Sequence, residues 1–178
     1  DAEVAMAVDA ATKAFYGSGS GGKGWKDFVV EQRIALVEKL VELFERDRDV
    51  LLACEIRDGG KVSELAEGDF GQIRACAEYF CGVARQIEMG DGPAMNVGNG
   101  MKGFAYREPW GVVAGIIPWN YPIVLTSWFM FPALLSGNTI LIKPAEDTPL
   151  SALYIARLAQ EAGFPPGVIN VLPGRGEI

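Results

Sequence analysis

Two short loops in the second half of the chain carry residue types that suit chemistry on a bound ligand. The first is Pro118-Trp119-Asn120-Tyr121-Pro122, in which two prolines stiffen the backbone and Asn120 stands between two aromatic side chains. In a rigid, partly dry loop, an amide N–H donor can strongly stabilise a developing oxyanion. The alternative is a strand-to-helix turn in which Asn120 caps the following helix. The pentapeptide alone leaves both interpretations open.

The second loop is Lys143-Pro144-Ala145-Glu146. An ammonium group can donate to a ribose hydroxyl, and a carboxylate three residues later can accept from one or both hydroxyls. A carboxylate there would repel a 2′-phosphate, so we expect NAD rather than NADP, with NADP as the alternative. The competing interpretation is a solvated Lys–Glu pair beside a helix start, worth about 0.5 kcal/mol.

Other site signals are weak or missing. Pro173-Gly174-Arg175-Gly176 is a tight glycine turn that could bring a cofactor close to the backbone, but Gly-x-Gly alone indicates little. None of the three apolar runs expected to be buried strands is followed by a Gly-x-Gly-x-x-Gly fingerprint, and the sequence has no phosphate-binding Walker loop. It also has no histidine, which excludes Ser-His-Asp catalysis and His-ligated zinc within these residues. We expect no metal site.

Three short apolar runs must position these loops. We expect buried strands over residues 111–117, 139–142 and 168–172, with helices over about 122–136 and 150–162 between them. We expect Thr148-Pro149 to cap the second of these helices. The order β-loop-α-β-loop-α-β predicts an α/β fold with a doubly wound, Rossmann-like parallel sheet. Ligands bind at the carboxyl ends of the strands in such sheets, where both loops lie.

The sequence pattern of the first half of the chain predicts a helical segment. Apolar residues at helical spacing predict a short first helix with Val4, Val8 and Ala11 on one face, and a clearer second helix with Arg33 on its polar side. Further helices are expected over about 50–56 and 63–87. The run Gly17-Ser18-Gly19-Ser20-Gly21-Gly22 predicts a mobile insertion. Residues 90–103 are rich in turn formers, and 104–106 could form an exposed strand.

Composition narrows the class of protein. The chain has 178 residues, 49% of them hydrophobic, which is enough for one domain with a sizeable core. Its net charge of -7 argues against a nucleic-acid partner and against a polybasic membrane anchor. No apolar run is long enough for a membrane span. No signal peptide is visible, and the missing initiator Met and the abrupt end suggest that both termini are cut. Three cysteines without C-x-x-C spacing favour packing roles and an intracellular setting, in the cytoplasm or an organelle matrix.

The ordered motifs resemble those of the aldehyde dehydrogenase superfamily. The resemblance is nearly continuous from Arg107 to Gly176 and looser over residues 1–106, where Asp58-Gly59-Gly60-Lys61 matches a recurring turn. Its motifs in this sequence are Arg107-Glu108-Pro109-Trp110-Gly111-Val112-Val113, Pro118-Trp119-Asn120-Tyr121-Pro122, Trp128 with Pro132-Ala133-Leu134, Gly137-Asn138-Thr139, Lys143-Pro144-Ala145-Glu146-Asp147-Thr148-Pro149, and Glu161-Ala162-Gly163-Phe164-Pro165-Pro166-Gly167-Val168. Six motifs in order are specific, although each alone is weak.

The resemblance implies an NAD-dependent oxidation of an aldehyde to a carboxylic acid through a cysteine thioester. It implies that Asn120 donates its amide to the substrate oxyanion. It further implies that Ile117, Pro118 and Trp119 line the reactive end of the cofactor, that Lys143 and Glu146 hold the adenosine ribose, and that Gly176 lies near the adenine. The family's nucleophilic cysteine and general-base glutamate would lie beyond Ile178. Many members have a lysine where this chain has Phe129.

The resemblance also implies an organisation and partners. Residues 1–90 would form the helical N-terminal part of the cofactor-binding domain, 91–107 a protruding oligomerisation strand segment, and 108–178 the first βαβαβ part of the NAD-binding domain. The expected partners are an aldehyde, NAD and further copies of the chain in a homodimer or homotetramer. Phe129 and the missing catalytic half leave a second hypothesis, a catalytically inactive structural or interaction subunit. An unrelated Rossmann-like binding module is the third.

Overall fold

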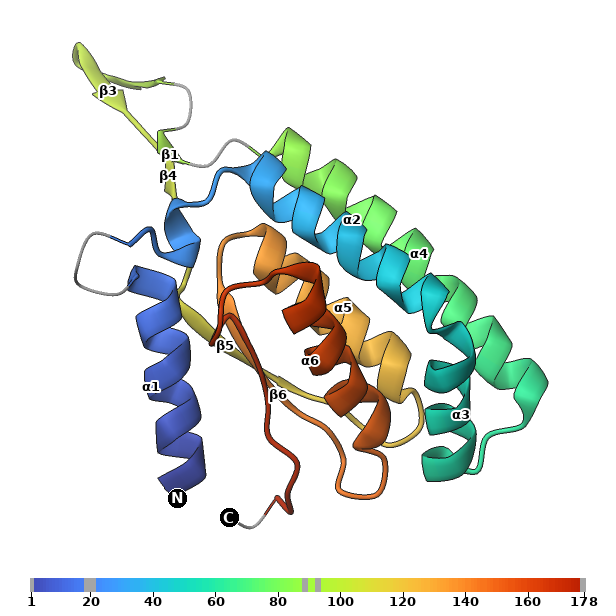
Figure 1. Cartoon of the computed structure of the whole chain (residues 1–178). Helices are drawn as coiled ribbons and strands as arrows, with labels where there is room; N and C mark the ends of the chain where they lie inside the picture. The colour runs from blue at the N-terminus through green and yellow to red at the C-terminus, as the bar shows by residue number, and fades with distance from the viewer. Residues whose placement is uncertain (1, 18–21, 88–89, 92–93, 177–178) are drawn as a thin grey trace.

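A computed structural model describes residues 2–17, 22–87, 90–91 and 94–176. Helices dominate the first half of the chain, and strands and helices alternate in the second half (Figure 1). The helices are α1 (Ala2–Tyr16), the 3-10 helix η1 (Trp25–Asp27), α2 (Val30–Arg46), α3 (Arg48–Gly59), α4 (Ser63–Gln86), α5 (Pro122–Leu135) and α6 (Leu150–Ala162). The strands are β1 (Gly90–Asp91), β2 (Met95–Gly98), β3 (Met101–Gly103), β4 (Tyr106–Arg107), β5 (Val112–Ile116), β6 (Thr139–Lys143) and β7 (Ile169–Val171).

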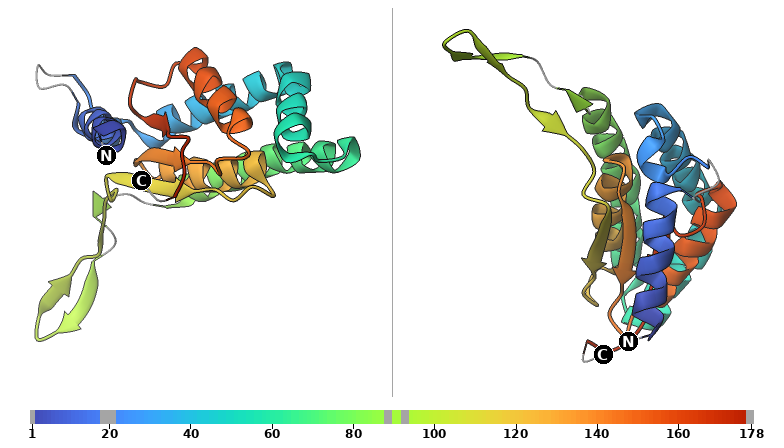
Figure 2. Two further views of the ribbon diagram at one scale, coloured as in Figure 1. Left: turned by 90° about the horizontal axis from the view of Figure 1, so that it is seen from below. Right: turned by 90° about the vertical axis from the view of Figure 1, so that its left-hand side faces the viewer.

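The main sheet is parallel and has the order β5-β6-β7. Its connections are the helices α5 and α6, as the alternating pattern predicts. Ile140 and Ile142 of β6 pack into the same core as residues of α5 and α6, whereas Thr139 on the other face donates to the carbonyl of Ala11 in α1. The sheet therefore lies between α1 and the pair α5 and α6 (Figure 2, left). The predicted α/β class with a helical N-terminal segment is confirmed.

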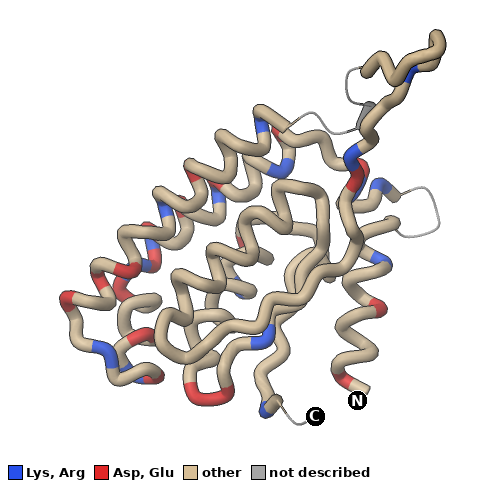
Figure 3. Tube along the Cα trace, turned by 180° about the vertical axis from the view of Figure 1, so that it is seen from behind, with Lys and Arg blue, Asp and Glu red and all other residues tan. Residues whose placement is uncertain are grey.

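The long helices form an outer layer over α5 and α6. Helices α2 and α4 lie side by side, and both also pack against α5 (Figure 1). Apolar residues of α2 at helical spacing are buried here, namely Ile34, Val37, Leu40, Val41 and Phe44. Lysine and arginine alternate with aspartate and glutamate along these outer helices (Figure 3). The amphipathic pattern of this segment is confirmed.

Arg33 departs from the prediction. It was expected on the polar side of the second helix, but its side chain is buried, where Nε donates to the carbonyl of Leu135 at 3.0 Å and Nη1 to that of Phe28 at 2.6 Å. Two carbonyls thus replace water around the guanidinium. Burial lowers the pKa of Arg33 from its ordinary value. Helical spacing could not show this, because Leu135 lies far away in the sequence.

Apolar residues of α1 and β5 are exposed in the structure. Val4 and Val8 of α1 are exposed, while Ala11 and Phe15 carry its contacts with the body of the molecule. Residues 111–117 were expected to be buried on both faces, yet Ile116 is 72% exposed. The reason is that β5 is an edge strand of the sheet and α1 covers only part of the face that carries Ile116. The central strand β6 is buried as predicted.

A β-hairpin projects from the body of the molecule (Figures 1 and 2). Strands β2 and β3 pair antiparallel around a turn at Asn99 and Gly100, both with positive φ. The strand expected over 104–106 was misplaced, since residues 104 and 105 link β3 to β4, which pairs with β1. Residues 18–21 of the predicted mobile insertion lie outside the described residues. None of the described helices is long and apolar enough to cross a bilayer.

Candidate functional site

The parallel sheet brings the two candidate loops together. The Pro118–Pro122 loop follows β5, and residues 144–149 follow β6, so both lie at the carboxyl edge of neighbouring strands. The strand pairing ends at Ile116 opposite Lys143, and the backbone N–H of Ile117 then donates to the carbonyl of Lys143 at 2.9 Å. One main-chain hydrogen bond therefore fixes the separation of the two loops where each leaves the sheet.

Asn120 does not cap the helix that follows it. The N-cap of α5 is Tyr121, with Pro122 in the first turn and no side-chain hydrogen bond to the helix end. Asn120 is exposed, and within the described part of the chain its amide has no hydrogen-bond partner. The capping alternative is therefore wrong, and the amide is available to a ligand.

The residues before Asn120 differ in what they present. Trp119 is 63% exposed and Pro118 is also at the surface, whereas the side chain of Ile117 is packed in the core. A ligand at this surface could therefore contact the backbone of Ile117 but not its side chain. Pro118 and Trp119 can contact a flat ligand directly. Their predicted roles at the cofactor remain predictions.

Lys143 and Glu146 form a loose pair on the second loop. Lys143 Nζ donates to the carbonyl of Pro144 at 3.0 Å and lies 3.9 Å from Glu146 Oε2. The side chain of Lys143 is 29% exposed and that of Glu146 is 50% exposed. An ammonium group has three donors and a carboxylate accepts at two oxygens, so most of this capacity is free for hydroxyl groups. The donor set suits a ribose diol.

The third strand delivers Gly176 to the same edge of the sheet, in an exposed turn after β7. A Cβ placed on Gly176 would meet no atom within 4 Å. Nothing within the described chain therefore requires glycine at this position, and a ligand approaching the backbone would supply such a reason. The predicted contact with the adenine side stays a prediction.

Sequence reasoning missed how the second loop is held. Thr148 does not cap α6, because its buried hydroxyl has no hydrogen-bond partner among the described residues. Instead Asp58 Oδ2, at the end of α3, accepts from the N–H of Leu150 at 2.7 Å. Gly60 ends α3 in the left-handed region, with φ 62°. The sequence signal was the turn Asp58-Gly59-Gly60-Lys61, a recurring turn whose type does not by itself indicate a cap on a distant helix.

The cysteines in this chain are poor nucleophiles. Cys76 and Cys81 are buried, and burial raises the pKa of Cys81 and raises that of Cys76 to about 11. Burial and the nearby carboxylates of Asp58 and Glu55 also raise the pKa of Cys54. Little thiolate exists in any of them at neutral pH. Their predicted packing role is confirmed for Cys76 and Cys81. No group of metal-ligating side chains was found in the described ranges.

Comparison with known proteins decides the family. The family model described as "Aldehyde dehydrogenase family" matches residues 1–178. The chain belongs to this family. Retinal dehydrogenase 2 of Homo sapiens, an aldehyde dehydrogenase relative, is 44% identical over 176 residues, which are 98% of this chain and 33% of that protein. An aldehyde dehydrogenase of Alternaria alternata is 42% identical over 177 residues, 99% of this chain and 34% of its own length. The chain thus spans about a third of these relatives.

Solved aldehyde dehydrogenase structures share the fold. The structure of PnpE in complex with nicotinamide adenine dinucleotide superposes with a TM-score of 0.88 at 42% identity, covering 99% of this chain and 34% of that one. An aldehyde dehydrogenase of Bacillus cereus in complex with NAD+ gives a TM-score of 0.88 at 38% identity, with the same two coverages. The expected fold is therefore confirmed.

Proposed function

We propose that this chain is the first cofactor-binding third of an NAD-dependent aldehyde dehydrogenase, which oxidises an aldehyde to a carboxylic acid through a cysteine thioester. The observation that carries the proposal is the hydrogen bond from the Ile117 N–H to the Lys143 carbonyl, because it joins both candidate loops at one edge of a family-typical sheet. NAD, when bound, supplies the hydride acceptor.

The loop after β6 would hold the cofactor. Lys143 would donate to, and Glu146 accept from, the adenosine ribose hydroxyls, with Gly176 beside the adenine. Ile117, Pro118 and Trp119 would line the reactive end. The NAD complexes of PnpE and the Bacillus cereus relative support this cofactor. Glu146 supports NAD over NADP because its charge would repel a 2′-phosphate.

Asn120 would act on the substrate. Its unpaired, exposed amide suits donation to the oxyanion that forms when a thiolate adds to the aldehyde carbon. None of Cys54, Cys76 and Cys81 suits that thiolate, since burial raises the pKa of each. The nucleophile and the general base would therefore come from the two thirds of the family length that this chain does not span.

The test uses the full-length natural protein and follows NADH formation with a panel of aldehydes. Asn120→Ala should lower kcat about 10²-fold through loss of the oxyanion donor, while the dissociation constant of NAD stays the same. Asn120→Asp, which keeps the size but loses the N–H donors, should behave alike.

Unchanged turnover in both variants would remove Asn120 from the mechanism. A full-length protein that binds NAD but oxidises no aldehyde, and that lacks a cysteine in family context, would instead be an inactive structural subunit. Phe129 keeps that alternative open, because it stands where many members have lysine. In this fold it packs against Gly115 of β5, where an added Cβ would lie 3.2 Å from the Phe129 Cβ.

We also propose that the protein forms a homodimer or homotetramer through the β2–β3 hairpin, and that it works inside the cell. The exposed apolar residues of the hairpin support self-association, and three free cysteines support a reducing compartment. The acidic net charge of -7 and the mixed charges on the outer helices argue against nucleic acid and anionic membranes as partners (Figure 3).

A further inference from the structure

Two buried carboxylates and a largely buried lysine lie beside the Pro118–Pro122 loop. Lys61 Nζ lies 3.3 Å from Glu55 Oε2 on α3 and donates a short hydrogen bond to Asp69 Oδ2 on α4. Their side chains are 11%, 1% and 8% exposed, respectively. We call these residues the Lys61 cluster. A charge withdrawn from water is stable only while it keeps its partners, so the ammonium group is held in one place.

The ammonium group also touches the loop that carries Asn120. Lys61 Nζ lies 5.0 Å from the centroid of the Tyr121 ring. This distance is within the range of a cation–π contact, which strengthens when the cation is shielded from water. Tyr121 directly follows Asn120, and its carbonyl accepts the N–H of Leu125 at 3.0 Å as α5 begins. A fixed Tyr121 ring thereby restricts the backbone next to Asn120.

Glu55 is the most deeply buried member of the cluster, and its Oε1 atom has no hydrogen-bond partner among the described residues. Burial raises the pKa of Glu55, while the Ser151 hydroxyl, the charge of Lys61 and the Ile123 amide act to lower it. Ile123 and Ser151 are in the first turns of α5 and α6, the helices that follow the two loops. Both groups favour the charged form of Glu55, as Lys61 does.

Lys61 remains a cation in this environment. Burial alone would lower its pKa, but the hydrogen bond with Asp69 and the charge of Glu55 outweigh burial and raise it. Without Lys61, Glu55 and Asp69 would be buried with no cation beside them. The contacts that hold Lys61 come from α3 and α4, whereas the ring it contacts belongs to the loop before α5.

We propose that Lys61, held by Glu55 and Asp69, is a positioning residue that fixes the Pro118–Pro122 loop through the ring of Tyr121 and so directs the Asn120 amide at the substrate. This inference rests on the proposed function, since Asn120 matters only if an oxyanion forms beside it. A misplacement of a reacting group by about 1 Å can cost as much as 10²-fold in rate. Lys61 itself contacts no reacting atom in this scheme.

The test compares Lys61→Met, Lys61→Arg and the matched control Lys39→Met in the full-length enzyme, with Lys39 exposed on α2. Rates are expressed per NAD-binding site, so that unfolded protein does not count. Lys61→Met should lower kcat about tenfold or more with the KM for NAD unchanged. Lys61→Arg should recover most of the rate, and Lys39→Met should match the wild type. A merely structural lysine would change the number of sites but not the rate per site.

A second readout does not depend on activity. Amide hydrogen exchange at residues 125–127, near the start of α5, should become about fivefold faster in Lys61→Met and stay unchanged in Lys61→Arg. If Lys61→Met fails to fold, Tyr121→Leu replaces it, because that change removes the ring and leaves the cluster intact. Tyr121→Phe, which keeps the ring, serves as its control.

Unchanged kcat and unchanged exchange in Lys61→Met, or in Tyr121→Leu where it replaces Lys61→Met, would overturn the role of Lys61. A wild-type enzyme that oxidises no aldehyde would overturn the proposed function instead. Exchange at residues 125–127 would still decide whether Lys61 holds the loop. The two failures are thus distinguishable.

Discussion

Asn120 and Glu146 stand out among single residues because the fold holds their backbones and leaves their side chains accessible. Two prolines and the start of α5 flank Asn120, and the Asp58 cap holds the helix that follows Glu146. Accessible polar side chains on a well-held backbone are typical of preformed ligand-binding sites. Buried Cys76, in contrast, has a raised pKa and packs as an apolar residue.

Glu146 provides a prediction at this scale. Glu146→Gln keeps the shape of the side chain but removes the charge, so NAD should bind about tenfold more weakly, because hydrogen bonds to charged groups are the stronger ones. Discrimination against NADP should shrink, since the repulsion of a 2′-phosphate is lost. Calorimetric titration of both cofactors into the full-length protein measures this, with the neighbouring exposed Asp147→Asn as the control. An unaltered NAD affinity would remove Glu146 from the ribose site.

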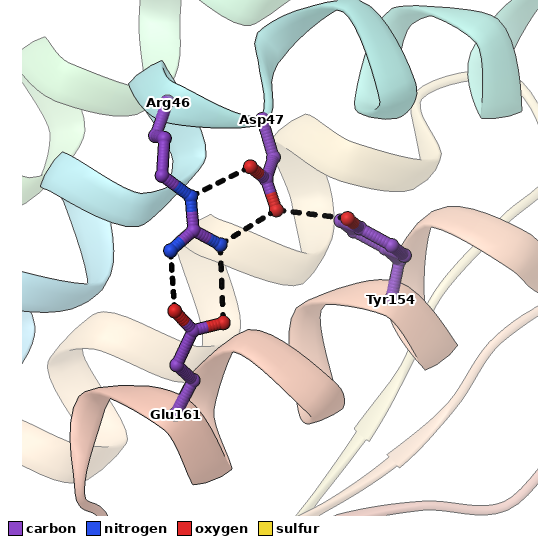
Figure 4. A network of polar contacts seen from close by, with 4 residues as sticks. All are labelled: Arg46, Asp47, Tyr154 and Glu161. Atoms are coloured by element: carbon purple, nitrogen blue, oxygen red, sulfur yellow. Dashed lines mark hydrogen bonds and ion pairs between the residues drawn. The ribbon is translucent and has the colours of Figure 1, made fainter.

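Among the elements, α6 is tied to the outer helices by a polar network that the sequence did not predict (Figure 4). Arg46 donates to Asp47 at 2.7 and 2.9 Å and to both carboxylate oxygens of Glu161, and the Tyr154 hydroxyl donates to Asp47 at 2.8 Å. Asp47 lies between α2 and α3, whereas Tyr154 and Glu161 belong to α6. The network therefore anchors the helix that follows the Lys143–Glu146 loop.

Because of this network, we expect the free energy of unfolding to fall at acidic pH. The hydrogen bonds from Arg46 and Tyr154 lower the pKa of Asp47 from 3.8 to about 2. The folded state then resists protonation more than the unfolded state. The stabilisation is complete above about pH 4 and is lost as the pH falls towards 2. Asp47→Asn should therefore flatten the loss of unfolding free energy between pH 4 and 2, as followed by urea denaturation at a series of pH values.

Two comparisons sharpen that experiment. Tyr154→Phe keeps the ring but removes one of the hydrogen bonds to Asp47, and should lie between Asp47→Asn and the wild type. Arg46 also lowers the pKa of Glu161, so some acid dependence remains in every variant that keeps Arg46. Identical slopes for Asp47→Asn and wild type would show that Asp47 is not stabilised by its partners in solution.

The elements show where sequence reasoning succeeds and where it ends. Apolar residues at a spacing of three and four located α2, and short apolar runs located β5, β6 and β7, because periodicity is a local property. The burial of Arg33 depends on carbonyls of Phe28 and of Leu135, which is 102 residues away. The cap of α6 likewise comes from Asp58, 92 residues before Leu150. Such contacts follow from the assembled fold and leave no mark on local spacing.

On the scale of the whole molecule, the β2–β3 hairpin is the feature that the rest of the fold does not explain. It extends away from the helices, and Met95, Val97 and Met101 are each more than half exposed (Figure 2). Exposed apolar strands with free edges invite pairing with another chain. The resemblance implied a protruding strand segment over residues 91–107, but its folding into a hairpin was not predicted.

Met101→Asp should weaken self-association, because it places a charge among the exposed apolar side chains beside the hairpin turn. We expect a shift towards smaller species in sedimentation velocity, with a dissociation constant about tenfold higher or more. Met6→Asp, an equally drastic change on exposed α1, should leave the assembly as it is. If Met101→Asp sediments like the wild type, the copies of the chain associate through another surface or not at all.

The site itself was predictable in part. Topology alone placed the loops after β5 and β6 at one sheet edge, and motif order supplied the roles proposed for Asn120, Lys143 and Glu146. The contact between Lys61 and Tyr121 could not be predicted from the sequence. A lysine in a glycine turn is expected at the solvated surface, and only the packing of α4 places Asp69 beside it. The type of a residue indicates which hydrogen bonds or ion pairs its side chain can form, but whether the side chain is buried depends on tertiary contacts.

The hydrogen bond from Ile117 to Lys143 has a consequence for how this protein can diverge in evolution. Because both of its atoms belong to the main chain, side-chain replacements at either position leave the bond formally intact. Proline at residue 117 is the exception, since it has no N–H to donate. Substitutions of ligand-contacting side chains on the two loops can therefore accumulate while the distance between the loops stays the same. New ligand specificities can arise in this way without a change in the backbone of the sheet.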